Sequence, residues 1–168
     1  MSAHRSSGSK RPGAISGPST ARTAAITLLA RRDYARAELE TRLLSGGFAA
    51  SEVAAALEDL ATAGTVNDAR LAQHYVAYHS GRGQGPIRIA AELRRRGLPA
   101  ALIEAALAGG PDWCALARRV RRAKFGTEKP PSWAEKARQA RFLQYRGFSS
   151  DHIRAATGAD PEAGFTDP

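Results

Sequence analysis

The sequence predicts an all-α protein of three tandem three-helix repeats in an elongated, curved array. The main observation is a turn motif, glycine followed by a large apolar residue, which recurs every 50 residues at Gly47, Gly97 and Gly147. Glycine adopts the left-handed backbone conformation at low cost, so it commonly ends a helix. In addition, no segment shows the sustained polar–apolar alternation and β-branched enrichment of a strand. We therefore expect helices throughout.

The same residue types recur at the same distances from each of these three glycines. A leucine stands four residues before it, a β-branched residue six after it and an alanine nine after it. These positions are Leu43, Leu93 and Leu143; Val53, Ile103 and Ile153; Ala56, Ala106 and Ala156. Agreement at several positions in three copies indicates a triplication. We expect the leucines and the β-branched residues to form the core.

Each repeat is expected to contain a leading helix followed by a helix–turn–helix pair. The leading helices are predicted at 21–32, 68–79 and 113–124, where apolar residues recur with helical period. In the third, the apolar stripe leaves Arg118, Arg119, Arg121 and Arg122 on the remaining surface. Pro99 and Ser149 stand where the last helix of the second and third repeats begins, a place that suits proline and serine. A helix of about 18 Å is too short to be stable alone in water, so the helices must pack together.

The chain divides into five predicted segments. A disordered basic arm is expected at 1–20, the three repeats at 21–64, 65–110 and 111–158, and a disordered tail at 159–168. Serine, glycine and proline are frequent in the arm, which is typical of segments that do not fold.

The charge is strongly basic and unevenly distributed. The 168 residues carry 25 Lys and Arg against 16 Asp and Glu, a net charge of +9. Residues 111–146 alone hold ten basic and three acidic side chains. Only four of the basic residues are lysines. Coding bias could explain the preference for arginine but not the clustering, which favours an anionic partner or an acidic protein surface.

The cysteine content and the length of the apolar runs indicate the cell compartment. Cys114 is the single cysteine, so no intrachain disulfide can form and a reducing compartment is expected. No apolar run is long enough to span a bilayer, and the first 20 residues lack the apolar centre of a secretory signal. We expect a cytoplasmic protein.

Catalytic and metal-binding patterns are not found in the sequence. His74 and His79 are five residues apart, which does not place them on one helix face. The glycine-rich segment 81–86 lacks both the preceding strand and the Lys-Ser/Thr of a phosphate loop. We interpret it as a flexible joint with Pro86 at a helix start, and we expect no enzyme activity, cofactor or metal.

Arginines and tyrosines are the candidate binding residues. The consecutive Arg94, Arg95 and Arg96 point in three directions on a helix, so at most two can face one partner. They form either one edge of a docking face or a solvated helix surface, with Arg96 near the helix C-terminal dipole. Tyr34, Tyr75, Tyr78 and Tyr145 could stack on bases or anchor a protein interface. Of these, Tyr75 is expected in the core, and Tyr34 is better placed for a surface role.

Several segments resemble the RecX regulatory proteins of bacteria. They are LLARRDYARAEL at the start of the first repeat, GQGPIRIAAELRRRGL in the second and RFLQYRGF in the third. In the second segment the matching residues are Gly85, Pro86, Arg88, Ile89, Glu92, Leu93, Arg96 and Gly97. The resemblance covers about Ala21 to Ala156. It implies a monomeric modulator, usually an inhibitor, that lodges in the groove of the RecA–DNA filament and acts in DNA repair, recombination and the SOS response.

The expected partner is the RecA filament, with single- or double-stranded DNA as a further candidate. We expect it to contact ten arginines, spread over all three repeats, and Tyr34. They are Arg31, Arg32, Tyr34, Arg88, Arg94, Arg95, Arg118, Arg119, Arg122, Arg138 and Arg141. A direct nucleic-acid-binding helical protein and a scaffold for acidic proteins are the alternatives. Phosphate binding alone weakens steeply with salt and needs no protein partner, which distinguishes these functions.

Overall fold

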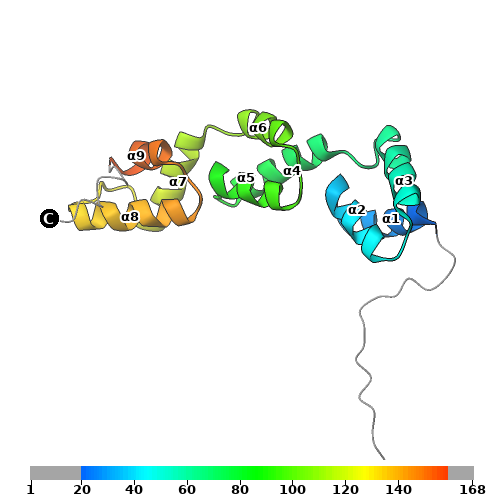
Figure 1. The fold of residues 1–168 in the computed structure, drawn as a ribbon. Helices are drawn as coiled ribbons and strands as arrows, with labels where there is room; N and C mark the ends of the chain where they lie inside the picture. The colour runs from blue at the N-terminus through cyan, green and yellow to red at the C-terminus, as the bar shows by residue number, and fades with distance from the viewer. Residues whose placement is uncertain (1–19, 159–168) are drawn as a thin grey trace, which may run out of the picture. The chain divides into compact units, whose positions relative to one another are not determined.

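The structure is a computed structural model that describes residues 20–158, and every regular element in that range is a helix (Figure 1). The predicted all-α class is confirmed. The arm and the tail expected at the two ends of the chain lie outside the described residues, apart from Thr20. The helices are α1 (Ala21–Leu29), α2 (Arg36–Ser45), α3 (Ala50–Thr62), α4 (Asp68–Gly81), α5 (Pro86–Arg95), α6 (Ala100–Ala108), α7 (Trp113–Phe125), α8 (Trp133–Tyr145) and α9 (Ser150–Thr157).

The repeated sequence positions form the core, as predicted. Leu43, Leu93 and Leu143 are each at most 1% exposed, and the β-branched residues of the three repeats are equally buried. The glycine that follows the second helix of each repeat has a φ between 82° and 91°, in the left-handed region. The 50-residue period therefore corresponds to one structural unit: a leading helix and a helix–glycine turn–helix pair.

Side-chain caps fix where the leading helices begin. Thr20, Asn67 and Asp112 each accept a hydrogen bond from a backbone N–H in the first turn of α1, α4 and α7. Such caps satisfy N–H groups that have no partner within the helix. α1 ends at Leu29, three residues before the predicted end, because the Arg31 N–H bonds to the Leu28 carbonyl and closes the last turn early.

The chain separates into two compact units, which are described individually. The first contains residues up to Tyr34 together with Glu38–Val66, and α1 packs on α3 around Leu39, Leu57 and Leu60. The second contains residues 35–37 and everything from Asn67 onward.

The second unit holds the second and third repeats. Its α4, α5 and α6 pack around Ile89, Leu93 and Ile103, and its α7, α8 and α9 pack around Leu143 and Ile153. None of the helices between residues 20 and 158 is long and apolar enough to cross a membrane.

Candidate binding surface

The second and third repeats are joined by backbone hydrogen bonds between two helix ends. The N–H of Gly85, which caps α5, donates to the Arg146 carbonyl at 2.8 Å, and the Ile87 N–H donates to the Gly147 carbonyl at 3.0 Å. Pro86 has no N–H to satisfy. The free N–H groups at the start of α5 thus bond the free carbonyl groups at the end of α8, and the two helix dipoles attract each other.

This junction has no room for a side chain. A Cβ on Gly85 would lie 2.3 Å from the Gly147 carbonyl oxygen, and a Cβ on Gly147 would lie 2.3 Å from the Arg88 Cβ. Gly83, Gly85 and Gly147 are all buried. The prediction of a flexible joint at 81–86 was therefore wrong: Gly85 lies where two backbones meet, and Gly83 has a φ of 77° and lies against the Val120 side chain. Pro86 does begin a helix, as predicted.

An exposed tyrosine lies beside this junction, among arginines. Tyr145 is 78% exposed, and the Arg88 guanidinium of the preceding repeat lies 5.8 Å from the centre of its ring. Arg138 and Arg141 lie seven and four residues before Tyr145 in α8, so helical periodicity places all three on one side of the helix. We call Arg88, Arg138, Arg141 and Tyr145 the Tyr145 face.

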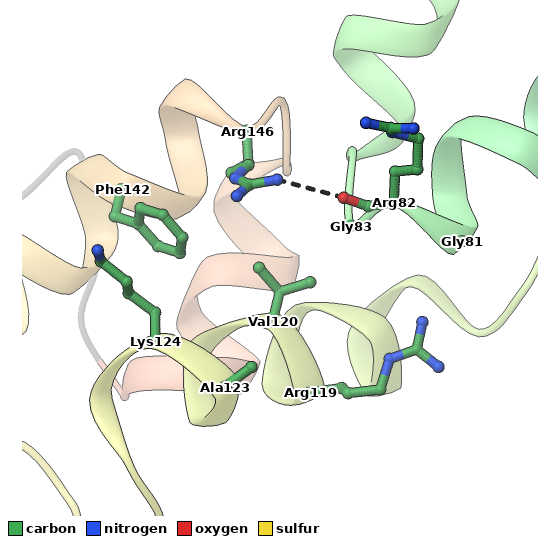
Figure 2. A pocket seen from close by; sticks show the side chains of 9 residues that line it. All are labelled: Gly81, Arg82, Gly83, Arg119, Val120, Ala123, Lys124, Phe142 and Arg146. Atoms are coloured by element: carbon green, nitrogen blue, oxygen red, sulfur yellow. Dashed lines mark hydrogen bonds between the residues drawn. The ribbon is translucent and has the colours of Figure 1, made fainter.

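A cavity of about 390 Å³ opens on another side of the junction. Figure 2 shows it between α7, the end of α8 and the segment after α4, with Val120 and Phe142 among its apolar residues. No acidic residue lines it, whereas four basic residues do. They are Arg82, Arg119, Lys124 and Arg146, and we call this site the basic cavity.

Three of the predicted binding arginines are paired with a carboxylate in the same repeat. Arg32 pairs with Glu38, Arg95 with Glu92 and Arg138 with Glu135. The hydrogen bond from Arg95 lowers the pKa of Glu92, and the hydrogen bond from Arg138 lowers the pKa of Glu135, so both pairs favour the ionised carboxylate. Exposed pairs of this kind contribute little free energy, so a partner can displace them at low cost.

The other predicted arginines are exposed and lack a carboxylate partner within residues 20–158. Arg118 donates to the Ala155 carbonyl at 3.1 Å, and Arg88 lies over Tyr145. The remaining ones are Arg31, Arg94, Arg119, Arg122 and Arg141. On α7, Arg118, Arg119 and Arg122 span an arc of about 100°, which makes one basic side of that helix. Arg31 and Arg32 belong to the first unit.

Two predictions about side-chain position were wrong. Tyr34, expected at the surface, is only 8% exposed because its ring packs in the core of the first unit under the Arg32 guanidinium, which lies 3.6 Å away. Arg121, grouped with the surface arginines of α7, is 5% exposed. Its Nε donates to the Gln139 Oε1 at 2.8 Å, and its guanidinium also bonds the Glu128 carbonyl, so the buried charge is satisfied. Tyr75, expected in the core, is partly buried against it.

Three basic residues of these two surfaces were not among the predicted binding residues, and Tyr145 was only one of four tyrosines considered for stacking or interface contact. Arg82 and Arg146 stand next to the glycines of the junction, and Lys124 and Tyr145 stand on α7 and α8. The sequence held one signal for Arg146, since an arginine precedes the turn glycine in both the second and the third repeat. Nothing in the local sequence distinguishes Arg82 or Lys124.

Comparison with known proteins gives a consistent result over the described range. Models of the RecX first, second and third three-helix domains match residues 21–60, 67–107 and 112–157. The regulatory protein RecX of Halorhodospira halophila is 44% identical over 142 residues, covering 84% of this chain and 88% of that protein. The regulatory protein RecX of Acidithiobacillus ferrooxidans is 40% identical, covering 84% and 91%.

A solved structure shares the fold. RecX from Lactobacillus salivarius superposes with a TM-score of 0.69 at 22% identity, covering 81% of this chain and 91% of that one. Three tandem three-helix domains, each matched by its own family model, agree with the repeat architecture derived from the glycine period, and the two relatives are 40% and 44% identical. The chain belongs to the RecX family of regulatory proteins.

Proposed function

We propose that this chain is a non-enzymatic modulator of the RecA recombinase that binds the RecA–DNA filament and limits its growth, ATP hydrolysis and strand exchange. Membership of the RecX regulatory family carries the proposal. The chemistry of the second unit supports it, because four exposed arginines that pair with no carboxylate between residues 20 and 158 lie on α7 and α8. They are Arg118, Arg119, Arg122 and Arg141.

The Tyr145 face is the part of that surface best suited to a protein partner. A tyrosine that is 78% exposed and flanked by arginines combines the two residue types that most often dominate binding energy at interfaces. Ile87, next to Arg88 at the start of α5, is 56% exposed and adds apolar area. The backbone bonds between α5 and α8 fix the two helix ends that carry these residues, so docking need not order the backbone there.

RecA ATP hydrolysis on single-stranded DNA, titrated with this protein at two salt concentrations, tests the proposal. We expect inhibition at a ratio well below one molecule of this protein per RecA subunit, because a protein that docks in a filament and stops its growth affects many subunits. Inhibition only near saturation of the DNA, which vanishes as salt is raised, would instead mean competition for the strand and favour direct nucleic-acid binding.

A further inference from the structure

We infer that the basic cavity binds the phosphodiester backbone of single-stranded nucleic acid, with a base stacked on Tyr78 at its edge. The starting observation is charge. Arg82, Arg119, Lys124 and Arg146 line one cavity of about 390 Å³ without an acidic residue among its lining groups. Such a concentration of positive charge attracts a polyanion and favours phosphate at the cavity.

Two of these arginines are held in position by groups that carry no charge. Arg146 donates a hydrogen bond to the Arg82 carbonyl at 3.2 Å, drawn as a dashed line in Figure 2. Its guanidinium also lies 5.4 Å from the centre of the Phe142 ring. Arg82 in turn donates to the Tyr78 hydroxyl at 2.9 Å. The contacts orient the guanidinium groups and leave their charge available.

The other two cations lie on α7, across the apolar floor of the cavity. Arg119 and Lys124 are exposed and make no ion pair with any residue between 20 and 158. Gly81 and Gly83 form part of the wall and have no side chain to obstruct a strand. Arginine can bind two phosphate oxygens at once, and lysine adds a point charge.

Tyr78 makes a nucleic acid a better occupant than an acidic peptide. Its ring is 60% exposed and next to Arg82, whose guanidinium lies 5.5 Å from the ring centre. Proteins that bind single strands without sequence preference combine a basic groove with an exposed aromatic ring on which a base stacks. A carboxylate side chain would use the cations but not the ring.

This inference rests on the proposed function in one respect: it takes the strand to be the one held in the RecA–DNA filament. Binding is nevertheless measurable without RecA, by fluorescence anisotropy of a labelled oligo-deoxythymidine. The test variant is Arg119→Ala with Lys124→Ala, two exposed positions whose replacement should preserve helicity. Its control is Arg22→Ala with Arg42→Ala, two exposed arginines outside the predicted binding residues, which removes the same charge from the first unit.

We expect the cavity variant to bind the oligonucleotide at least about tenfold more weakly than the control variant. The slope of log K against log salt should fall in magnitude by about 1.4, since each lost contact to a single strand contributes about 0.7. Tyr78→Ala should weaken binding at least about fivefold through lost stacking. Tyr78→Phe keeps the ring and loses only the bond to Arg82, so it should weaken binding less than Tyr78→Ala does.

Equal binding by the cavity and control variants would overturn the inference. So would a cavity variant that binds the oligonucleotide normally but no longer inhibits RecA, because the cavity would then hold an acidic group of the protein partner. Normal oligonucleotide binding through the cavity with no effect on RecA would retain this inference and reject the proposed function.

Discussion

Gly85 and Gly147 meet backbone to backbone: a Cβ on Gly85 would fall 2.3 Å from the Gly147 carbonyl oxygen. The contact allows the start of α5 to donate two hydrogen bonds to the end of α8, and it joins the second and third repeats. Because the Tyr145 face and the basic cavity both draw residues from the two repeats, their geometry depends on this pair.

Gly85→Ala should therefore destabilise the protein by about 3 kcal/mol, since the added methyl group meets backbone atoms that cannot move aside without separating the helices. Gly81→Ala is the matched control, because a Cβ there has nothing within 4 Å and alanine suits a helix end. Urea unfolding followed by circular dichroism measures both. Equal midpoints for the two variants would show that the junction tolerates a side chain.

Arg121→Leu should cost about 2 to 3 kcal/mol, because it leaves the buried Gln139 side chain and the Glu128 carbonyl without their donor. Arg122→Leu, at the next position of α7 but exposed, should change stability by less than about 0.5 kcal/mol. Thermal unfolding of both variants provides the comparison. A larger loss for Arg122→Leu would contradict the assignment of Arg121 as the structural arginine.

The fold could be predicted from the sequence because its determinants are local. A left-handed glycine after each second helix and a leucine one turn before it act within a few residues, so their period alone identified the repeats and Leu43, Leu93 and Leu143 as core. The start of α5 at Pro86 and the serine cap of α9 follow from the same short-range rules.

The binding surface could not be predicted in the same way, because it depends on contacts between distant residues. Arg121 is buried because Gln139, 18 residues away, satisfies it, whereas helical period alone places it among the surface arginines. Arg82 and Arg146 come together across 64 residues of chain, through a hydrogen bond that no local pattern encodes. The number of basic residues per segment predicted a basic third repeat, but it did not distinguish the Tyr145 face from the basic cavity.

Tyr145→Ala should weaken inhibition of RecA ATP hydrolysis at least about tenfold, because a central aromatic residue flanked by arginines is the usual hot spot of an interface. Trp133→Ala is the control, since Trp133 is 67% exposed at the other end of the same helix, about 18 Å away. Both variants should keep their melting temperature. If Trp133→Ala loses as much inhibition as Tyr145→Ala, docking is not centred on the Tyr145 face.

Acid should destabilise the third repeat through His152. Its Nδ1 accepts a hydrogen bond from the Ser149 N–H in the capping box of α9, which requires a neutral ring, and burial lowers the pKa of His152 against the opposing effect of Asp151 and Asp112. A lowered pKa in the folded state means that the unfolded chain binds the proton more readily. The stabilisation is therefore complete above the unfolded-state pKa of about 6.5 and is lost as pH falls through the folded-state pKa.

His152→Gln tests this prediction, because glutamine keeps an acceptor at this position but does not titrate. Melting temperatures measured near pH 7.5 and near pH 5 should differ more for the unchanged protein than for His152→Gln, and equal differences would assign the acid sensitivity to other groups.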